Sequence, residues 1–401
     1  MNYNTLPEFI EARMRGYQKR FVEQWKGKHL LKSSAPTAND VSLCSNDYLD
    51  LLQDPSLYVE PKRGTHLLMS SVFLGEDSLQ AEVERAFSGF FNVENSILCP
   101  SGWMANAGLI QTIANKRTPV YIDKLAHMSF HDGARLAGAT AYMFAHGDAA
   151  SAGAKIAAHG PGVIVVDSVY STDGSLCPLS DFAVLSEQTG CVLVVDEAHA
   201  AGTHGPQGRG RVNELKLLDK VDFMTVSLAK AFAGRAGLIT CTTAFKDYFL
   251  VESHPSIFSS ALMEHDLQWF MKAIPAIRNA DDKRKRLHAN AHYLRTHLHD
   301  LGFKVSSGTE QIIAVQVGSE HHVQLLQTKL QQRGIFGSVF CYPATAKNKA
   351  LVRLSVHSEL TEFDLANVVL AFKVALRELR QMGIDGFCRA DFVAEASTPP
   401  V

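Results

Sequence analysis

Residues 221–237 read V-D-F-M-T-V-S-L-A-K-A-F-A-G-R-A-G, and residues 191–202 read C-V-L-V-V-D-E-A-H-A-A-G. The first stretch is an apolar, strand-like run that leads to Lys230 and then to small residues and glycine. The second predicts a buried strand that ends at Asp196, with His199 just beyond it. Ligands of parallel sheets bind at the carboxyl ends of the strands, so we expect Asp196, His199 and Lys230 to share one site.

Apolar strand-like runs alternate with helical patterns on both sides of these stretches. Strands are expected at residues 119–123, 141–144, 162–167, 191–196, 223–227 and 236–241, and helices at 77–91, 102–114 and 126–136. Continuous apolar strands separated by helices are typical of a mostly parallel sheet that helices cover on both faces. We therefore predict an α/β fold with such a central sheet in its large domain.

The sequence pattern divides the chain into three regions. Residues 1–57 are expected to form an N-terminal arm, with helical spacing over 7–25, residues 58–264 the large domain, and residues 265–401 a smaller α/β domain. For the smaller domain the pattern predicts one long helical stretch at 264–301, further helices at 322–333 and 361–382, and strands at 303–306, 311–317 and 351–355. The tail after residue 389 is expected to fray.

The composition is that of a globular, soluble protein. The 401 residues are 46% hydrophobic and 20% charged, with a formal net charge of -2, so no strong field would recruit nucleic acid or an anionic membrane. No signal peptide and no run of about 20 apolar residues is visible. The seven cysteines form no C-x-x-C pair, and the histidines no metal-binding helix pair. We expect a cytoplasmic protein with reduced thiols and no metal.

Lys230 and Asp196 together indicate pyridoxal phosphate chemistry. A lysine amine forms a Schiff base with the aldehyde of this cofactor, and a carboxylate keeps the pyridine nitrogen protonated, which makes the ring an electron sink. Taken alone, a lysine after a strand is usually a surface residue, and an aspartate there often caps a helix. The small residues around Lys230, with Ser227 three positions before it, favour the functional interpretation.

Two further segments fit the same cofactor. Ser101, Gly102 and Trp103 open a helix, where backbone N–H groups and the helix dipole favour a phosphate. His127 follows a strand and has the aromatic ring to stack on the pyridine face. The string D-E-A-H also occurs in helicases, but that function requires a G-x-x-x-x-G-K-[ST] phosphate loop, which the sequence lacks.

The sequence resembles the α-oxoamine synthase family of fold-type I pyridoxal phosphate enzymes. The matching strings span most of the chain in family order: N-D-Y-L at Asn46, S-G-W-M-A-N at Ser101, A-H-M-S at Ala126, D-S-V-Y-S-T-D-G at Asp167, V-D-E-A-H-A-A-G-T-H-G at Val195, S-L-A-K-A at Ser227, I-F-S-S at Ile257 and L-V-R-L-S at Leu351. Within the family, the strings near Met69, Gly160 and Phe340 are similar to the CqsA-type synthases of long-chain α-hydroxyketone autoinducers. Housekeeping branches carry a Gly- and Arg-rich motif where this chain has Leu68, Met69, Ser70 and Ser71.

The resemblance implies a role for individual residues. Lys230 would hold the cofactor and act as acid and base at the substrate Cα, Asp196 would pair with the pyridinium nitrogen, and His127 would stack on the ring. It also implies the following contacts: Ser101, Gly102, Trp103 and Ser227 with the phosphate; His199 and Ser171 near the 3-oxygen; Ser259 or Ser260 with the phosphate of a neighbouring subunit; Arg353 with the donor carboxylate; Asn46 and Tyr48 at the acyl entrance; and Thr345 with substrate.

By the same resemblance, the enzyme condenses a medium-chain acyl-CoA, such as decanoyl-CoA, with an amino donor, S-adenosylmethionine or 2-aminobutyrate. It would be a homodimer with its active sites at the subunit interface. Two alternatives stay open. One is a housekeeping synthase that uses glycine or alanine to make 8-amino-7-oxononanoate or 2-amino-3-ketobutyrate. The other is a non-catalytic partner subunit, although such subunits typically lose the lysine that Lys230 provides here.

Overall fold

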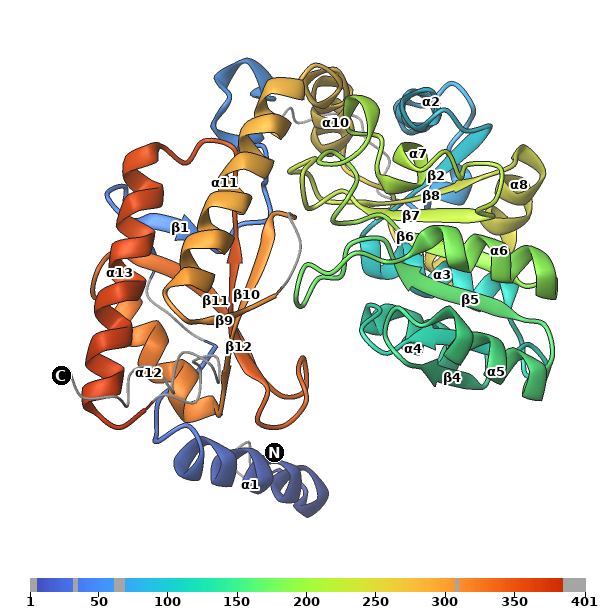
Figure 1. Cartoon of the computed structure of the whole chain (residues 1–401). Coiled ribbons are helices and arrows are strands. Elements are labelled where there is room, and N and C mark those ends of the chain that lie inside the picture. Colours follow the sequence, from blue (N-terminus) through green and yellow to red (C-terminus); the bar gives the residue numbers. More distant parts are fainter. Residues whose placement is uncertain (1–5, 32–34, 61–68, 307–309, 385–401) are drawn as a thin grey trace. The chain divides into compact units, whose positions relative to one another are not determined.

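The computed structural model describes residues 6–31, 35–60, 69–306 and 310–384. Leu68 and the tail after residue 389 lie outside the described residues. The chain divides into two compact units (Figure 1). The large unit comprises residues 46–288 and 357–359, and the small unit comprises residues 1–45, 289–356 and 360–401. These boundaries differ from the expected ones at 57 and 264. Residues 41–43 pair with a strand of the small unit, and the helix at 264–278 packs against the helix at 79–91 in the large unit.

The large unit is built on a seven-stranded sheet in the order β2-β8-β7-β6-β5-β3-β4. The strands are β2 (Asn95–Cys99), β3 (Val120–Asp123), β4 (Ala141–Phe144), β5 (Val163–Asp167), β6 (Val192–Asp196), β7 (Phe223–Ser227) and β8 (Gly237–Cys241). Strands β4, β3, β5, β6 and β7 are parallel, whereas β8 runs antiparallel to both of its neighbours. The prediction of a mostly parallel central sheet is confirmed.

Helices cover both faces of this sheet. They are α2 (Leu79–Phe91), α3 (Gly102–Ile113), α4 (Met128–Leu136), α5 (Ala149–His159), α6 (Leu179–Thr189), α7 (Arg211–Glu214), α8 (Thr243–Glu252), α9 (His254–Phe258) and α10 (Glu264–Arg278). Leu109 of α3 and Phe130 of α4 pack against Ile122 and Val165 of the sheet in one apolar core. Side chains alternate between the faces of a strand, and Phe144 of β4 packs against Phe182 of α6, with the ring centroids 5.5 Å apart.

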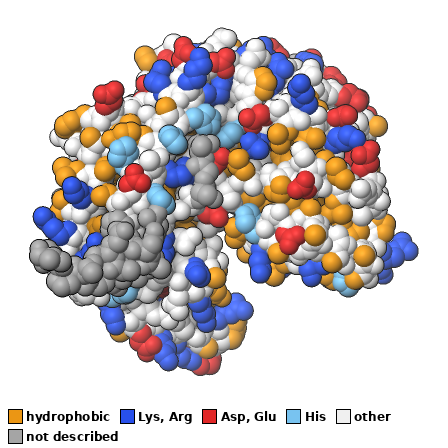
Figure 2. Space-filling model, viewed as in Figure 1, with side chains coloured by type: hydrophobic (Ala, Val, Ile, Leu, Met, Phe, Trp, Pro, Cys, Tyr) orange, Lys and Arg blue, Asp and Glu red, His pale blue; other side chains and the backbone are white. Residues whose placement is uncertain are grey.

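The small unit contains a five-stranded sheet in the order β1-β11-β12-β10-β9. Its strands are β1 (Val41–Leu43), β9 (Lys304–Val305), β10 (Ile312–Gly318), β11 (Ile335–Phe340) and β12 (Ala350–Ser355), and its helices are α1 (Glu8–Glu23), α12 (Glu320–Gln331) and α13 (Glu362–Gln381). Strand β1 pairs in parallel with β11, and the other pairs are antiparallel. Acidic and basic side chains are interspersed over the visible face of the described residues (Figure 2).

The stretch expected as one long helix at 264–301 is instead two helices, α10 (Glu264–Arg278) and α11 (Asp281–Asp300). Arg284 explains the break, because its guanidinium donates to the backbone oxygens of Ile277 at 2.7 Å and Arg278 at 3.4 Å. The last carbonyls of a helix have no partner inside that helix. The arginine therefore stabilises the end of α10 and lets the chain start a new helix at Asp281.

Helix α1 is tied to the rest of the small unit by Arg20. The Arg20 guanidinium contacts Glu320 of α12 at 2.9 Å and the backbone oxygen of Tyr342 at 2.5 Å. It also lies over the rings of Trp25 and Tyr342, with 4.9 and 5.5 Å to their centroids. Since α1 itself buries no residue, this arginine is a main anchor between the helix and the loop after β11.

A buried ion pair joins three elements at the β2 edge of the large unit. Lys246 of α8 contacts Glu84 of α2 at 2.7 Å, and the second Glu84 oxygen accepts the backbone N–H of Leu98 in β2 at 2.8 Å. Removing one partner of a buried pair leaves an uncompensated charge. We expect Lys246→Met to lower the free energy of unfolding by about 3–5 kcal/mol in urea titrations. Adding Glu84→Gln should recover most of this loss; a single substitution that costs nothing measurable contradicts the assignment.

Glu197, the residue after Asp196, holds the start of α7. Its two carboxyl oxygens accept the backbone N–H groups of Arg211 and Val212 at 2.9 and 2.7 Å. Burial raises the pKa of Glu197 to about 7, from an ordinary value of 4.5. Between these values the unfolded chain has lost the proton and the folded chain keeps it. The free energy of unfolding therefore falls as the pH rises through this window.

We expect Glu197→Gln to remove this part of the pH dependence. Between pH 5 and 7.5 the wild type should lose up to roughly 3 kcal/mol more of its free energy of unfolding than the variant does. Urea titrations at the two pH values measure the difference. Glu187→Gln, at an exposed ion pair with Lys220, is the control and should match the wild type. Equal pH slopes for wild type and Glu197→Gln would show that Glu197 has an ordinary pKa.

Candidate active site

Three neighbouring parallel strands deliver the predicted residues to one edge of the large sheet. Asp167 at the end of β5 lies beside Asp196 at the end of β6, and Asp196 lies beside Thr225 of β7. Lys230 follows β7 in a tight turn, where its backbone oxygen accepts the N–H of Ala233 at 2.8 Å. The prediction that Asp196 and Lys230 leave neighbouring strands at the carboxyl edge is thus confirmed by the register of β6 and β7.

Asp196 is buried, with 5% of its surface exposed. One carboxylate oxygen accepts the backbone N–H of Ala198 and the other accepts the side-chain amide of Asn106, both at 2.8 Å. Burial raises the pKa of Asp196, and these two donors and the charges of His127 and Lys230 oppose the rise. Burial, with Asp196 as its charged neighbour, raises the pKa of Asp167 well above its usual value. Burial therefore favours the protonated form of Asp167, whereas the donors and positive neighbours of Asp196 favour its anion.

His127 begins α4 as its N-cap residue. Its Nδ1 lies 2.7 Å from the Ser129 hydroxyl, and its backbone N–H donates to Asp167 at 3.3 Å. The edge of the Trp103 ring system lies against it, with 5.6 Å between the ring centroids. Burial lowers the pKa of His127, the Lys230 charge lowers it further, and the Asp196 charge raises it. His127, Asp196 and Lys230 are therefore within electrostatic reach of one another.

The start of α3 packs tightly on the end of β7. Ser101 is the N-cap, and its hydroxyl accepts the backbone N–H of Met104 at 3.2 Å. A Cβ atom added to Gly102 would lie 2.6 Å from the Cβ of Ser227, and one added to Gly237 would lie 2.3 Å from the backbone oxygen of Ser101. Only glycine fits at both positions. The first N–H groups of α3 and the Ser227 hydroxyl are thereby brought together, as an anion site requires.

The structure also brings Tyr48 to His199. The Tyr48 hydroxyl lies 2.7 Å from Nδ1 of His199 and donates to the side-chain oxygen of Asn46 at 3.1 Å. Both rings are almost completely buried. Two residues that the resemblance assigns to the acyl entrance are thus joined to one that it assigns to the cofactor.

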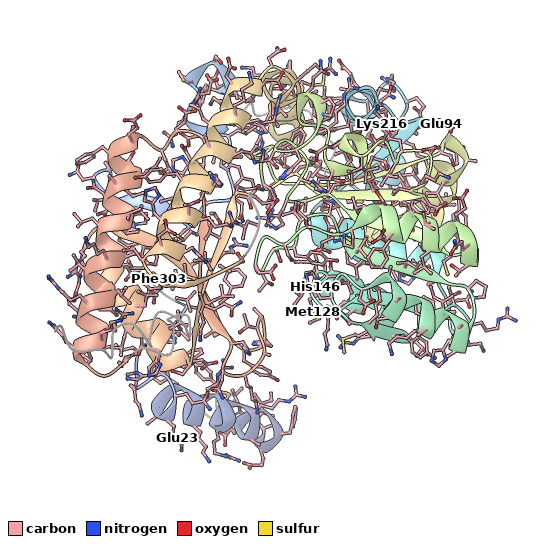
Figure 3. The ribbon with its side chains drawn as sticks, viewed as in Figure 1. Glu23, Glu94, Met128, His146, Lys216 and Phe303 are labelled. Atoms are coloured by element: carbon pink, nitrogen blue, oxygen red, sulfur yellow. The ribbon has the colours of Figure 1, made fainter. Side chains whose placement is uncertain are left out.

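Ser171 lies in the turn after β5, and His146 fixes this turn. The His146 ring contacts buried Asp123 at the end of β3 at 3.0 Å and the Ser175 hydroxyl at 2.9 Å. Its pKa is raised because hydrogen bonding to Asp123, and the Asp123 and Asp173 charges, outweigh the opposing effect of burial. Figure 3 labels His146 together with Met128, the first residue of α4. A buried carboxylate and a histidine therefore hold the loop that carries Ser171 against the sheet edge.

The predicted phosphate or substrate contacts of four residues are not tested by the structure. Ser259 donates to the backbone oxygen of Pro255, and Ser260 pairs with Ser70 in an isolated antiparallel bridge. Their predicted phosphate contact belongs to a neighbouring subunit and stays a prediction. Within the small unit, Arg353 of β12 is buried, and its guanidinium lies 4.6 Å from the Phe340 ring centroid. The backbone N–H of Thr345 donates to the backbone oxygen of Cys341. Their contacts with substrate also stay predictions.

Sequence reasoning missed two residues of this site, Asn106 and Ser129. Both are buried, and Asn106 donates to Ser129 at 3.0 Å as well as to Asp196. The motifs S-G-W-M-A-N and A-H-M-S contain them. A lone asparagine within the apolar helix α3 was the available signal, because a buried amide needs polar partners.

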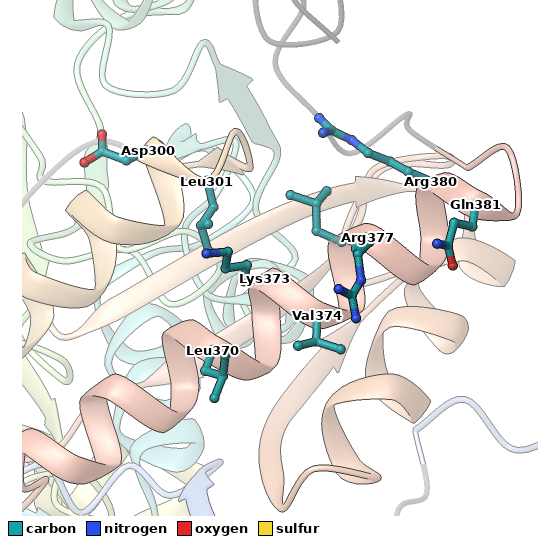
Figure 4. A pocket seen from close by; sticks show the side chains of 9 residues that line it. Asp300, Leu301, Leu370, Lys373, Val374, Arg377, Arg380 and Gln381 are labelled. Carbon is teal, nitrogen blue, oxygen red and sulfur yellow. The ribbon is translucent and has the colours of Figure 1, made fainter. Parts of the chain in front are cut away.

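Three further features of the described residues bear on the kind of site. None of their helices has the length and apolarity needed to span a membrane. In the same part of the chain, no three His, Cys, Asp or Glu side chains gather as metal ligands would. A hollow of about 660 Å³ lies in the small unit, where Leu370, Lys373 and Arg377 of α13 and Leu301 line it (Figure 4). No residue predicted for the active site lines this hollow.

The residues at the sheet edge fit pyridoxal phosphate. The glycine-only contact between α3 and Ser227 provides a cradle for a phosphate. Asp196 is a buried carboxylate that can pair with a protonated ring nitrogen, and Lys230 supplies an amine for the aldehyde. His127 adds a flat ring near both. When bound, the cofactor would supply an electron sink for a carbanion at the substrate Cα.

Comparison with known proteins agrees with this site. The family model described as "Aminotransferase class I and II" matches residues 38–372. The chain therefore belongs to this family of pyridoxal phosphate-dependent enzymes. A CAI-1 autoinducer synthase of Vibrio campbellii is 40% identical over 92% of the chain and 95% of that protein.

A further relative and a solved structure agree with this family. An 8-amino-7-oxononanoate synthase of Trichlorobacter lovleyi is 31% identical over 84% of the chain and 88% of that protein. A solved structure of serine palmitoyltransferase from Sphingomonas wittichii matches with a TM-score of 0.82 at 24% identity, covering 93% and 98% of the two chains. The predicted fold-type I fold, the pyridoxal phosphate cofactor and the α-oxoamine synthase class of enzyme are confirmed.

Proposed function

We propose that the protein condenses a medium-chain fatty acyl-CoA, such as decanoyl-CoA, with S-adenosylmethionine or 2-aminobutyrate. The product is a long-chain amino ketone, the precursor of an α-hydroxyketone autoinducer. The observation that supports this branch is the 40% identity to a CAI-1 autoinducer synthase, against 31% or less for the 8-amino-7-oxononanoate synthases among the relatives compared. We further propose a cytoplasmic homodimer in which Ser259 or Ser260 reaches the neighbouring subunit's site.

The residues of the sheet edge have distinct tasks in this reaction. Lys230 would anchor the cofactor through its amine and would then remove and return the proton at the donor Cα. The Asp196 carboxylate would pair with the protonated ring nitrogen, so that the bound cofactor supplies an electron sink. The ring of His127 would lie against the cofactor ring. Ser101, Gly102, Trp103 and Ser227 would bind the phosphate, and His199 and Ser171 would contact the 3-oxygen.

The substrate ends are bound by other residues. Arg353 pairs with the donor carboxylate, as guanidinium groups do with planar anions. Asn46 and Tyr48 line the path of the acyl chain, and Thr345 contacts substrate. Through its hydrogen bond with His199, Tyr48 also couples acyl binding to the residues around the ring.

Product analysis tests the proposal. Purified protein supplied with pyridoxal phosphate is incubated with S-adenosylmethionine, 2-aminobutyrate, glycine or alanine, each with acyl-CoAs of several lengths, and products are identified by mass spectrometry. A long-chain amino ketone formed from S-adenosylmethionine or 2-aminobutyrate supports the autoinducer branch. Preferred turnover of glycine or alanine with pimeloyl- or acetyl-CoA would assign the chain to a housekeeping synthase instead.

A further inference from the structure

A chain of hydrogen bonds runs from Asp196 to His127 through Asn106 and Ser129. The Asn106 amide nitrogen lies 2.8 Å from Asp196 and 3.0 Å from the Ser129 hydroxyl, which lies 2.7 Å from Nδ1 of His127. Asn106, Ser129 and Asp196 are all at least 95% buried. Asn106 belongs to α3, Ser129 to α4 and Asp196 to β6. This row of hydrogen bonds therefore connects three elements of the large unit.

Counting hydrogens fixes the direction of each bond. The amide nitrogen of Asn106 has two hydrogens; one goes to the Asp196 carboxylate and the other to the Ser129 oxygen. When Asp196 is ionised, Asn106 cannot turn its oxygen toward it, because two acceptors would then face each other. Among the hydrogen bonds of the described residues, Nδ1 of His127 is the acceptor available to the Ser129 hydroxyl, so the hydroxyl directs its own hydrogen at this nitrogen. The backbone N–H of Ser129 points at the same nitrogen from 3.4 Å.

His127 is consequently held in one form. Two donors aimed at Nδ1 make it an acceptor, so the neutral ring carries its hydrogen on Nε2. A positively charged ring would need a hydrogen on Nδ1, where it would face these donors. Burial of the ring and the Lys230 charge lower the pKa of His127 in the same direction.

Because His127 is held neutral, it does not compete with the ring nitrogen of the cofactor for the Asp196 carboxylate. The Asp196 charge raises the pKa of His127, and an imidazolium would take up the anion that the ring nitrogen of the cofactor needs. Asn106 strengthens the anionic form of Asp196 by hydrogen bonding to it. Its own side-chain oxygen finds no partner among the described residues, so the amide is placed for its donors and not for its acceptor.

We propose that Asn106 and Ser129 are positioning residues that keep Asp196 anionic and His127 neutral, with the His127 hydrogen on Nε2. The inference rests on the proposed function only in assigning Asp196 and His127 to the cofactor ring. Asn106 and Ser129 themselves act through these two residues and need not touch cofactor or substrate. The Asp196 anion then stays available to the ring nitrogen of the cofactor, and the His127 ring on the cofactor face stays uncharged.

Nitrogen NMR of the full-length protein tests this directly. Protein with ¹⁵N-labelled histidine is studied with and without added pyridoxal phosphate, and His127→Gln identifies the His127 signals. In the wild type at neutral pH, Nδ1 should give the shift of an unprotonated nitrogen and Nε2 that of a protonated one. In Ser129→Ala the acid dissociation constant of the imidazolium should fall about tenfold or more, and the two neutral forms should mix.

Matched variants separate positioning from folding. Ser129→Thr keeps the hydroxyl and should restore the wild-type signals. Ser186→Ala removes another buried hydroxyl, which donates to the backbone oxygen of Cys191, and should change nothing. Asn106→Ala should also shift the pH titration of the bound cofactor's visible absorbance. If Asn106→Ala does not fold, the Ser129 variants decide the question alone.

Two outcomes would overturn the inference. One is a wild-type His127 with its hydrogen on Nδ1. The other is a Ser129→Ala protein whose His127 titrates as in the wild type. Neither result depends on which substrates the enzyme uses. A wild type that releases no CoA from decanoyl-CoA would overturn the proposed function and leave the NMR result intact.

Discussion

Lys230→Ala will abolish turnover, with a loss of roughly 10⁴-fold or more, because it removes both the covalent anchor of the cofactor and the acid–base group. The protein should still fold, since Lys230 lies in a turn that backbone hydrogen bonds close. Borohydride reduction followed by peptide mass spectrometry should find the cofactor attached to the peptide that contains residue 230 in the wild type. The same peptide from the variant should be unmodified.

Lys220→Ala is the matched control. Lys220 forms an exposed ion pair with Glu187 near the opposite end of β6 and β7, and its loss should leave turnover unchanged. Modification of another lysine in the wild type, or turnover in Lys230→Ala close to that of the control, would remove Lys230 from the mechanism.

Asp196→Asn will have the second largest effect, a loss of about 10²–10³-fold in kcat. An amide of the same shape has no charge to keep the ring nitrogen protonated, and it places a second NH₂ group opposite Asn106. Cofactor affinity should fall as well. Steady-state kinetics and titration of the cofactor-free protein with pyridoxal phosphate measure both effects.

Two further variants separate the effect of the Asp196 charge from that of its side-chain shape. Asp196→Glu retains the anion and should keep more activity than Asp196→Asn. Asp148→Asn changes an aspartate that caps α5 by accepting the N–H of Ser151, where asparagine serves equally well. A kcat for Asp196→Asn equal to that of Asp148→Asn would contradict the assignment of Asp196 to the ring nitrogen.

The large sheet could be predicted because its strands are buried on both faces. Runs such as V-I-V-V-D and V-L-V-V-D have no polar residue before the aspartate. The sequence therefore indicates that they are buried strands and that each ends at its aspartate. The site followed from the same ends, since Asp196 and Lys230 directly follow two such strands. Ser101 is the N-cap of α3 and Gly102 its first residue, which confirms that the Ser-Gly pair marks the start of a helix.

Other elements depend on contacts that local pattern does not contain. Strands β1 and β11 pair across almost 300 residues of sequence, so the N-terminal segment was expected as a separate arm. Strand β2 (Asn95–Cys99) and helices α5, α6, α8 and α9 were not predicted. The break between α10 and α11 depends on Arg284, whose long side chain reaches back to the preceding helix. Nothing in the helical periodicity of this segment indicates such a contact.

Buried polar residues that support the site or the neighbouring helix α7 were hidden for a similar reason. Asn106, Ser129 and Glu197 owe their partners to the packing of α3, α4 and α7 on the sheet. A sequence shows that a polar residue lies on an apolar helix, but its hydrogen-bond partners come from other elements. Motif residues that touch the cofactor were therefore easier to identify than those that act through a neighbour.

The most direct test of the account is the visible spectrum of the purified protein during reaction, with CoA release measured in parallel. We predict an absorbance band of covalently bound pyridoxal phosphate that changes when S-adenosylmethionine or 2-aminobutyrate is added. A further change, with stoichiometric release of CoA, should follow addition of decanoyl-CoA. A protein that shows no band even after incubation with pyridoxal phosphate, and that releases no CoA with any donor, would contradict the account.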